Sequence, residues 1–161
     1  MVTTVLKNAD GAAYLKLGDI EGESVDREHK DWIIIESMSS PLFRAQASTD
    51  SSGQCQLELS GRDEPGLGDV VIVRELDKSS VKLQEASCGG TAAHFDEAVI
   101  DLVSSKRRGR QPYLRYKLTN VIVTSYSISP GTNSAGDTVP MESFSLNFEA
   151  IEFEYVPSRS K

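Results

Sequence analysis

The sequence predicts a mainly β protein, a sandwich or barrel with one short helix, and three observations support this. Runs of alternating apolar and polar residues recur along the chain, turn-forming residues separate them, and a single stretch has a credible helical pattern. Alternation with a period of two is typical of strands that bury one face, and many short strands of this kind are typical of sandwiches and barrels. The runs are 13–17, 31–37, 54–60, 69–76, 97–103, 113–118, 120–128 and 142–156.

The strand runs differ in what they indicate. The run QCQLELS at 54–60 alternates without interruption, which predicts one face on a core and one face toward water. In the last run the apolar residues stand at even positions up to Phe148 and at odd positions from Ile151. A slip of one residue moves every side chain to the other face, so a bulge or a sharp bend is expected near Glu149 and Ala150.

Segments rich in Gly, Pro, Ser and Asp separate the runs. The segments 61–69 and 129–140 are predicted to be plain loops, and the basic SKRRGR that ends at Arg110 is predicted to be a solvated hairpin loop. The segment 38–53 is long for a connection and contains Leu42 and Phe43, which suggests a binding role. No linker, repeat or change of composition divides the chain, so we expect one domain over 1–161.

The helix is expected at about 80–88, within RELDKSSVKLQEASCGG at 74–90. Ser79 or Ser80 can cap it, Leu83 and Ala86 form a narrow apolar stripe, and the glycine pair that follows Cys88 ends it. So short a helix is marginal in water and must pack on the strands. It either covers an open end of a barrel or also contacts another subunit.

Composition and charge exclude several classes of protein. The chain has 24 acidic and 17 basic residues and a formal charge of -7, which disfavours nucleic acid as a partner. No apolar run approaches the roughly 20 residues of a membrane span, so stable membrane insertion is not expected. Lys7 and Asp10 interrupt the N-terminal region where a cleavable signal peptide would need an apolar core. We therefore expect a cytoplasmic protein, or one exported without such a signal.

Catalytic and metal-binding patterns are absent from the sequence. The chain contains no G-x-S-x-G, H-E-x-x-H, glycine-rich phosphate loop or EF-hand pattern, and no cofactor is implied. Its two histidines are His29, expected to satisfy backbone groups beside Trp32, and His94, which makes only a weak nucleophile pair with Cys88. Cys55 and Cys88 are interpreted as small core residues. The chain is thus predicted not to be an enzyme.

Five segments, taken together, resemble the Hcp family, the haemolysin-coregulated proteins of bacterial type VI secretion. They occur in the family's order and span most of the chain. The segment RELDKSSVKLQEA, which precedes and enters the predicted helix, is the strongest sign of the resemblance. Val81 departs from the family, whose members often carry proline there, and the loop 38–53 is individual. The segments are AYLKLGDIEGES (13–24), HKDWIIIES (29–37), RELDKSSVKLQEA (74–86), YLRYKLTNVIVTSYSIS (113–129) and DTVPMESFSLNFEAIEFEY (137–155).

The resemblance implies a closed barrel of two packed antiparallel sheets with one flanking helix, and a structural role without catalytic residues. It implies a homohexameric ring that stacks into a tube, is propelled out of the cell, contacts sheath and spike-tip proteins, and carries small effector proteins in its lumen. The expected ring-stacking contact is Leu42, Phe43 and Arg44. The expected lumen or ring-interface helix residues are Ser80, Lys82, Leu83 and Glu85.

Two other functions remain open at this point. The chain could be a monomeric β-barrel module that binds a sugar or peptide through Leu42, Phe43 and Arg44. It could also be a small hydrolase built on Cys88 and His94. The first alternative predicts a monomer whose melting temperature a ligand raises.

Overall fold

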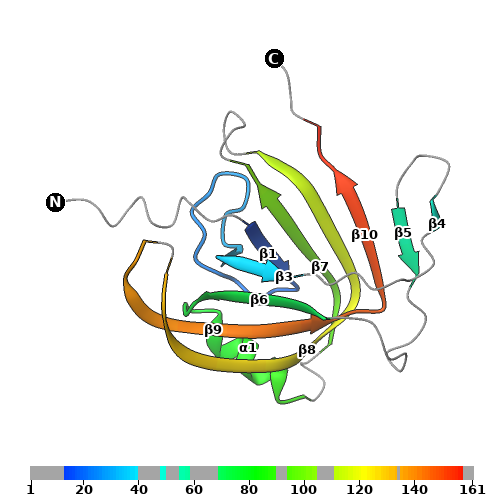
Figure 1. The fold of residues 1–161 in the computed structure, drawn as a ribbon. Coiled ribbons are helices and arrows are strands. Elements are labelled where there is room, and N and C mark those ends of the chain that lie inside the picture. Colours follow the sequence, from blue (N-terminus) through cyan, green and yellow to red (C-terminus); the bar gives the residue numbers. More distant parts are fainter. Residues whose placement is uncertain are drawn as a thin grey trace.

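A computed structural model of the chain describes residues 13–39, 48–49, 55–58, 69–89, 94–104, 111–133 and 135–157. Within these residues, strands dominate and one helix interrupts them, as the sequence predicts (Figure 1). The elements are β1 (Ala13–Leu17), β2 (Ile33–Ile35), β3 (Ser37–Ser39), β4 (Ser48–Thr49), β5 (Cys55–Glu58), β6 (Val70–Glu75), α1 (Ser80–Ser87), β7 (His94–Val103), β8 (Pro112–Thr132), β9 (Thr138–Asn147) and β10 (Ala150–Tyr155).

All strands belong to one antiparallel sheet that curves around the core. Its main path is β2-β1-β7-β8-β10-β5-β4, and a branch leads from β8 through β9 and β6 to β3. The long strand β8 pairs with β7 and β10 along its first half and with β9 along its second half. Figure 1 shows β8 and β9 sweeping below the other strands as a bent ribbon.

The closed barrel of two packed sheets that the resemblance implies is not what the structure shows. Among the residues that the structure describes, the pairing ends at β2, β3 and β4, so the sheet is branched and is not closed into a barrel. The physical reason for a single sheet lies in β8, which has 21 residues and runs through both halves. Both halves hydrogen-bond to the same strand, so their strands form one continuous sheet.

Two irregular positions explain how β8 pairs with β7 and β10 along its first half and with β9 along its second half. Asn120 has φ 52°, a left-handed conformation that asparagine tolerates better than most residues, and it is the first residue of the run predicted at 120–128, close behind the run at 113–118. The pairing with β9 also shifts register between Val123 and Ser125. The two predicted strands are therefore one strand with a bend and a bulge.

The bend predicted near Glu149 and Ala150 is confirmed. β9 ends at Asn147 and β10 begins at Ala150, and both Phe148 and Ile151 are buried on either side of the break. The Glu149 N–H donates to the Thr119 carbonyl at 3.0 Å, which holds the corner against β8. The change of parity thus reflects a change of direction that keeps both apolar sets on the core.

The loop predicted at 129–140 is mostly a hairpin. β8 continues to Thr132 and β9 begins at Thr138, with Pro130 paired opposite Pro140. The two prolines made the segment resemble a loop because proline cannot donate to a ladder. Here both lie near the tip of the hairpin, where few ladder hydrogen bonds are lost, and the turn is confined to the residues between the strands.

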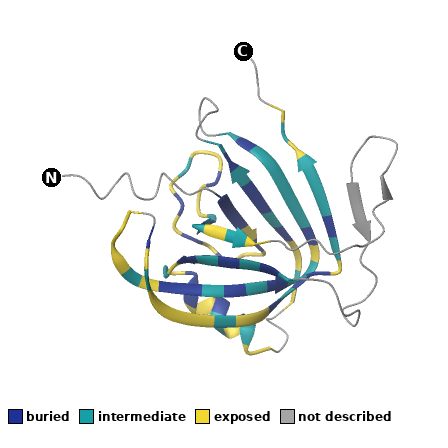
Figure 2. Cartoon of the chain, in the orientation of Figure 1, coloured by how far each residue is buried: buried dark blue, intermediate teal, exposed yellow. Residues whose placement is uncertain are grey.

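One apolar core lies inside the curved sheet. It gathers the inward-facing residues of the central strands together with Leu83 and Ala86 of the helix. Figure 2 shows buried residues alternating with less buried ones along β6, β7 and β9, the pattern of strands with one covered face. The largest fully buried side chains of this core include Leu15, Ile33, Ile72, Ile100, Leu118, Phe144 and Leu146.

Candidate functional site

The helix α1 packs on the second half of β8 and presents one face to solvent. Ser80 and Leu83 are buried, with Leu83 fully enclosed in the core. Lys82 and Glu85 are exposed, and so is Val81, whose exposed fraction of 62% is large for an apolar residue. Of the four predicted helix residues, Lys82 and Glu85 are therefore accessible to another molecule, whereas Ser80 and Leu83 hold the helix on the sheet.

The start of α1 is capped differently from the sequence prediction. Ser79 is the N-cap residue but makes no side-chain capping bond. Its N–H instead donates to Asp77 Oδ1 at 2.8 Å, and the Asp77 N–H donates to Ser80 Oγ at 3.0 Å. The turn before the helix is thus closed by reciprocal bonds between Asp77 and the two serines. The helix ends at Ser87 with Cys88 as its C-cap, and Gly89 follows with a φ of +85° that favours glycine, as predicted.

A buried arginine fastens this turn to the sheet. Arg74 on β6 is 1% exposed and points its guanidinium at the turn, with Nη2 2.5 Å from Asp77 Oδ1 and Nη1 donating to Ser79 Oγ at 2.7 Å. Its Nε lies 3.3 Å from Oε1 of Glu142, a buried carboxylate on β9. Since a buried charge needs partners, this cluster fixes the direction in which α1 leaves the sheet.

A second set of contacts holds the middle of α1. Tyr126 on β8 donates its hydroxyl to Glu142 Oε2, and Gln84 Nε2 of the helix donates to the same hydroxyl at 3.3 Å. Burial and the hydrogen bond to Glu142 raise the pKa of Tyr126 to about 12. Tyr126 therefore stays protonated and keeps donating to Glu142 over the whole physiological range. We call Arg74, Asp77, Ser79, Tyr126 and Glu142 the helix anchor.

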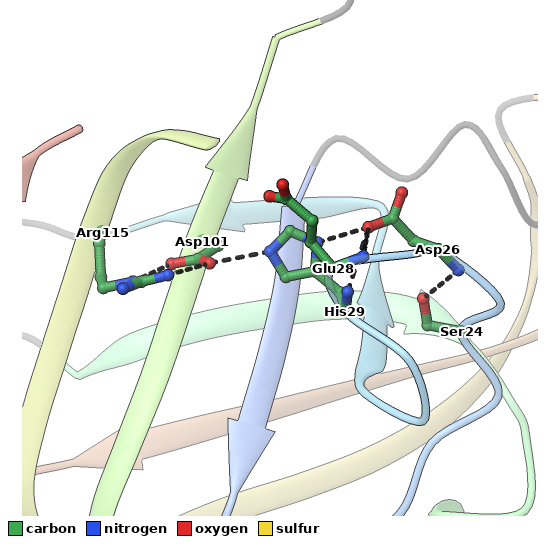
Figure 3. A network of polar contacts seen from close by, with 6 residues as sticks. All are labelled: Ser24, Asp26, Glu28, His29, Asp101 and Arg115. Atoms are coloured by element: carbon green, nitrogen blue, oxygen red, sulfur yellow. Dashed lines mark hydrogen bonds and ion pairs between the residues drawn. The ribbon is translucent and has the colours of Figure 1, made fainter. Parts of the chain in front are cut away.

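A different polar cluster, drawn in Figure 3, lies where the loop 18–32 covers the outer face of the sheet. Tyr14 of β1, Asp101 of β7 and Arg115 of β8 are cross-strand neighbours on that face. The ring of His29, on the loop, stacks on Tyr14 with centroids 4.6 Å apart. Its Nε2 lies 2.8 Å from Asp101 Oδ2. The cluster therefore joins three strands to a loop that precedes β2.

The electrostatics of this cluster favour the charged forms of His29 and Asp101. Burial lowers the pKa of His29, but the hydrogen bonds and charges of Asp101 and Asp26 raise it by more, so the pKa lies above 6.5. Burial raises the pKa of Asp101, but hydrogen bonds from Arg115 and His29 outweigh it, so the pKa lies below 3.8. His29 was expected to satisfy backbone groups, and this was wrong because carboxylates occupy both of its ring nitrogens.

The other predicted site residues are placed as follows. Leu42, Phe43 and Arg44 lie outside the described residues, and so does the side chain of Cys55. Cys88 is a free and exposed cysteine, so its assignment to the core was wrong: it follows the apolar stripe at the solvent end of the helix. His94 is also exposed. No group of His, Cys, Asp and Glu that could hold a metal occurs among the described residues.

The surface over β1 and β7 contains a hollow, and the length of the helix bears on whether it can cross a membrane. A hollow of about 360 Å³ lies over β1 and β7, where Phe95 and Val99 meet the charged side chains of Lys16, Asp96 and Glu97. None of the helices in the described part of the chain combines the length and the apolar character needed to cross a membrane.

Sequence reasoning missed the charged residues that organise both clusters. Arg74 stands at a position of β6 that shares its face with the buried Val70 and Ile72, and a charge in such a position is a signal of a buried ion pair. Asp101 likewise stands within an apolar run. Both charged residues stand out in the sequence, but the sequence does not show which residues they pair with.

The fold and these contacts define a class of protein: a curved antiparallel sheet to which one helix and one loop are fastened by buried ion pairs. Comparison with known proteins identifies the family within this class. The model of the family described as "Type VI secretion system effector, Hcp" matches residues 14–155. The chain belongs to the Hcp family of type VI secretion, a family of structural, secreted tube proteins, which confirms the resemblance seen in the sequence.

Individual relatives agree with this assignment. The chain is 24% identical to "Protein hcp1" of Pseudomonas aeruginosa over 147 residues, which are 91% of this chain and 84% of the relative. A type VI secretion system effector from Yersinia pestis shares the fold with a TM-score of 0.67 at 23% identity, with 92% of each chain covered. Hcp1 from Salmonella typhimurium has a TM-score of 0.65 at 21% identity, covering 90% of this chain and 85% of that one.

Proposed function

We propose that this chain is the tube subunit of a bacterial type VI secretion system. In this proposal six copies form a ring, rings stack into a tube, and the tube is propelled out of the cell with small effectors in its lumen. The observation that carries the proposal is the family match over residues 14–155, which includes the helix and both polar clusters. The subunit resides in the cytoplasm before export and contacts sheath and spike-tip proteins.

The geometry of α1 supports a ring contact. A head-to-tail contact that repeats with rotation closes into a ring and needs two different rigid patches on each subunit. The helix anchor holds α1 on the sheet while Val81, Lys82 and Glu85 remain exposed. An exposed valine flanked by charges resembles the apolar centre and polar rim of an interface. We therefore place one of the two patches on this helix face, and stacking on Leu42, Phe43 and Arg44.

The variant Val81→Asp tests this placement. It puts a charge at the centre of the proposed patch, so rings should dissociate while the subunit keeps its fold, because Val81 contributes little to the core. Sizing chromatography with light scattering gives the assembly, and circular dichroism gives the fold. Val25→Asp is the matched control, since Val25 is an equally exposed valine at 68% and lies on the loop 18–32.

Rings that survive Val81→Asp unchanged would show that the helix face is not a ring contact. Rings lost in both valine variants would show that the charge acts through a general loss of solubility or fold. The alternative function, a monomeric ligand-binding module, has the hollow beside Phe95 as its specific support. It predicts a monomer at high concentration and a rise in melting temperature with a sugar or peptide.

A further inference from the structure

We propose that His29 is a pH-dependent clasp that holds the loop 18–32 against the outer face of the sheet. The loop carries His29, whose side chain is 2% exposed between the loop and the strands. Figure 3 shows the ring lying between Asp26, on the same loop, and Asp101, on β7. The proposal concerns the folded subunit alone and does not depend on ring or tube formation.

Both ring nitrogens carry a proton in this geometry. Nδ1 lies 2.7 Å from Asp26 Oδ2, and Nε2 lies 2.8 Å from Asp101 Oδ2. An ionised carboxylate can only accept a hydrogen bond, and a neutral imidazole has only one N–H to donate. Both short contacts are satisfied together only when the ring is an imidazolium, so the clasp closes with His29 positively charged.

Arg115 keeps the carboxylate of Asp101 ionised. Arg115 donates to both oxygens of Asp101, from Nε at 2.6 Å and from Nη2 at 2.8 Å. Tyr14 stacks on the ring and Trp32 contacts it in a T-shaped arrangement, so two aromatic side chains flank the imidazole. The charged and titratable groups around the clasp are Asp26 and Glu28 on the loop, Tyr14 on β1, Asp101 on β7, Arg115 on β8, and Glu154 on β10, which acts on Arg115.

The two sides of the clasp respond differently when the ring loses a proton. Asp101 keeps its two bonds from Arg115 and takes the one remaining ring N–H. Asp26 then retains only the backbone N–H groups of Glu28 and His29, each at 3.2 Å. The loop side therefore opens, whereas the sheet side stays intact. The pH range follows from the raised pKa of His29: the clasp is complete below 6.5 and is lost as pH rises through the higher pKa of the folded state.

Opening of the loop is expected to affect the start of the helix, because the loop contacts the residue that precedes the helix N-cap. Glu23 Oε1 accepts the Lys78 N–H at 3.2 Å, and Glu21 Oε2 lies 3.8 Å from Lys78 Nζ. Lys78 directly precedes the N-cap residue of α1. The protonation state of His29 thus affects the segment that leads into the helix, through the contacts that Glu21 and Glu23 of the loop make with Lys78.

The test is an NMR titration of the full chain combined with hydrogen exchange of the loop amides. The chain has only two histidines, so the spectrum contains two imidazole signals, and His94→Asn identifies the exposed one. His29 should titrate above 6.5. After correction for the intrinsic rate, protection of amides in 24–31 should fall by about tenfold or more across that titration, as expected for one charge-assisted hydrogen bond, while β7 stays protected.

Matched variants separate the clasp from a general effect. Asp26→Asn removes the negative charge of the acceptor, so it should bring the pKa of His29 closer to 6.5 and weaken the pH dependence of loop exchange. Asp19→Asn, an exposed loop aspartate, should leave both unchanged. A wild-type His29 that titrates at or below 6.5, or loop protection that does not follow its titration, would overturn the proposal without any variant.

Discussion

Replacing Arg74 by methionine is expected to lower the free energy of unfolding by about 3–5 kcal/mol, the usual cost of removing one partner of a buried ion pair. Methionine retains much of the volume but leaves Glu142, which is 1% exposed, without its cation. The turn at Asp77 and Ser79 also loses the guanidinium that holds it to β6. Urea denaturation followed by circular dichroism measures the change.

The control for Arg74 removes the same kind of charge from the surface. Lys82→Met on the exposed face of α1 should change the free energy of unfolding by no more than about 0.5 kcal/mol. The double variant Arg74→Met with Glu142→Gln should recover part of the loss, because it no longer leaves a buried carboxylate unpaired. A loss below about 1 kcal/mol for Arg74→Met alone would show that the helix anchor does not stabilise the fold.

The second large effect is expected at Leu83, where substitution by alanine should cost about 2–5 kcal/mol. Leu83 is fully buried and is the main apolar contact between α1 and the core. A helix this short depends on packing for its existence, so the loss should appear as a loss of helical signal before the sheet unfolds. Thermal unfolding monitored at the helical and strand wavelengths resolves the two steps.

Two substitutions calibrate the Leu83 result. Leu83→Met keeps the volume and should cost less than about 1.5 kcal/mol, whereas Val81→Ala, on the exposed side of the same helix, should cost under about 0.5 kcal/mol. If Leu83→Ala proved as mild as Val81→Ala, the helix would not depend on the core. The proposed ring patch would then lack its rigid support.

Local patterns were sufficient to predict most of the fold. The strand at Ala13–Leu17 and the helix within 74–90 were located by periodicity and end signals, because each uses contacts close in sequence. The bend between β9 and β10 was also predictable, since a change of parity has one economical explanation. The loop at 129–140 was mispredicted because Pro130 and Pro140 suggest interruption unless they are known to face each other.

The clusters that organise the site depend on pairs far apart in the sequence. His29 and Asp101 meet because β1 and β7 pair and the loop folds back over them, which no local pattern encodes. The same holds for Arg74 and Glu142, which face each other across the pairing of β6 and β9. Sequence reasoning could therefore flag a charge in an apolar run, but it could not name the partner. The prediction of a closed barrel was wrong for a related reason. Whether the sheet closes depends on how far the long strand β8 extends, and local patterns do not show this.

The most direct test of the tube-subunit proposal is the native mass of the protein, measured by light scattering on a sizing column, with a negative-stain image of the same fraction. The proposal predicts a particle of six times 17.6 kDa with a central hole. A monomer of 17.6 kDa at high protein concentration would contradict it. The chain would then share the fold of the Hcp family without its assembly, and the ligand-binding alternative would take its place.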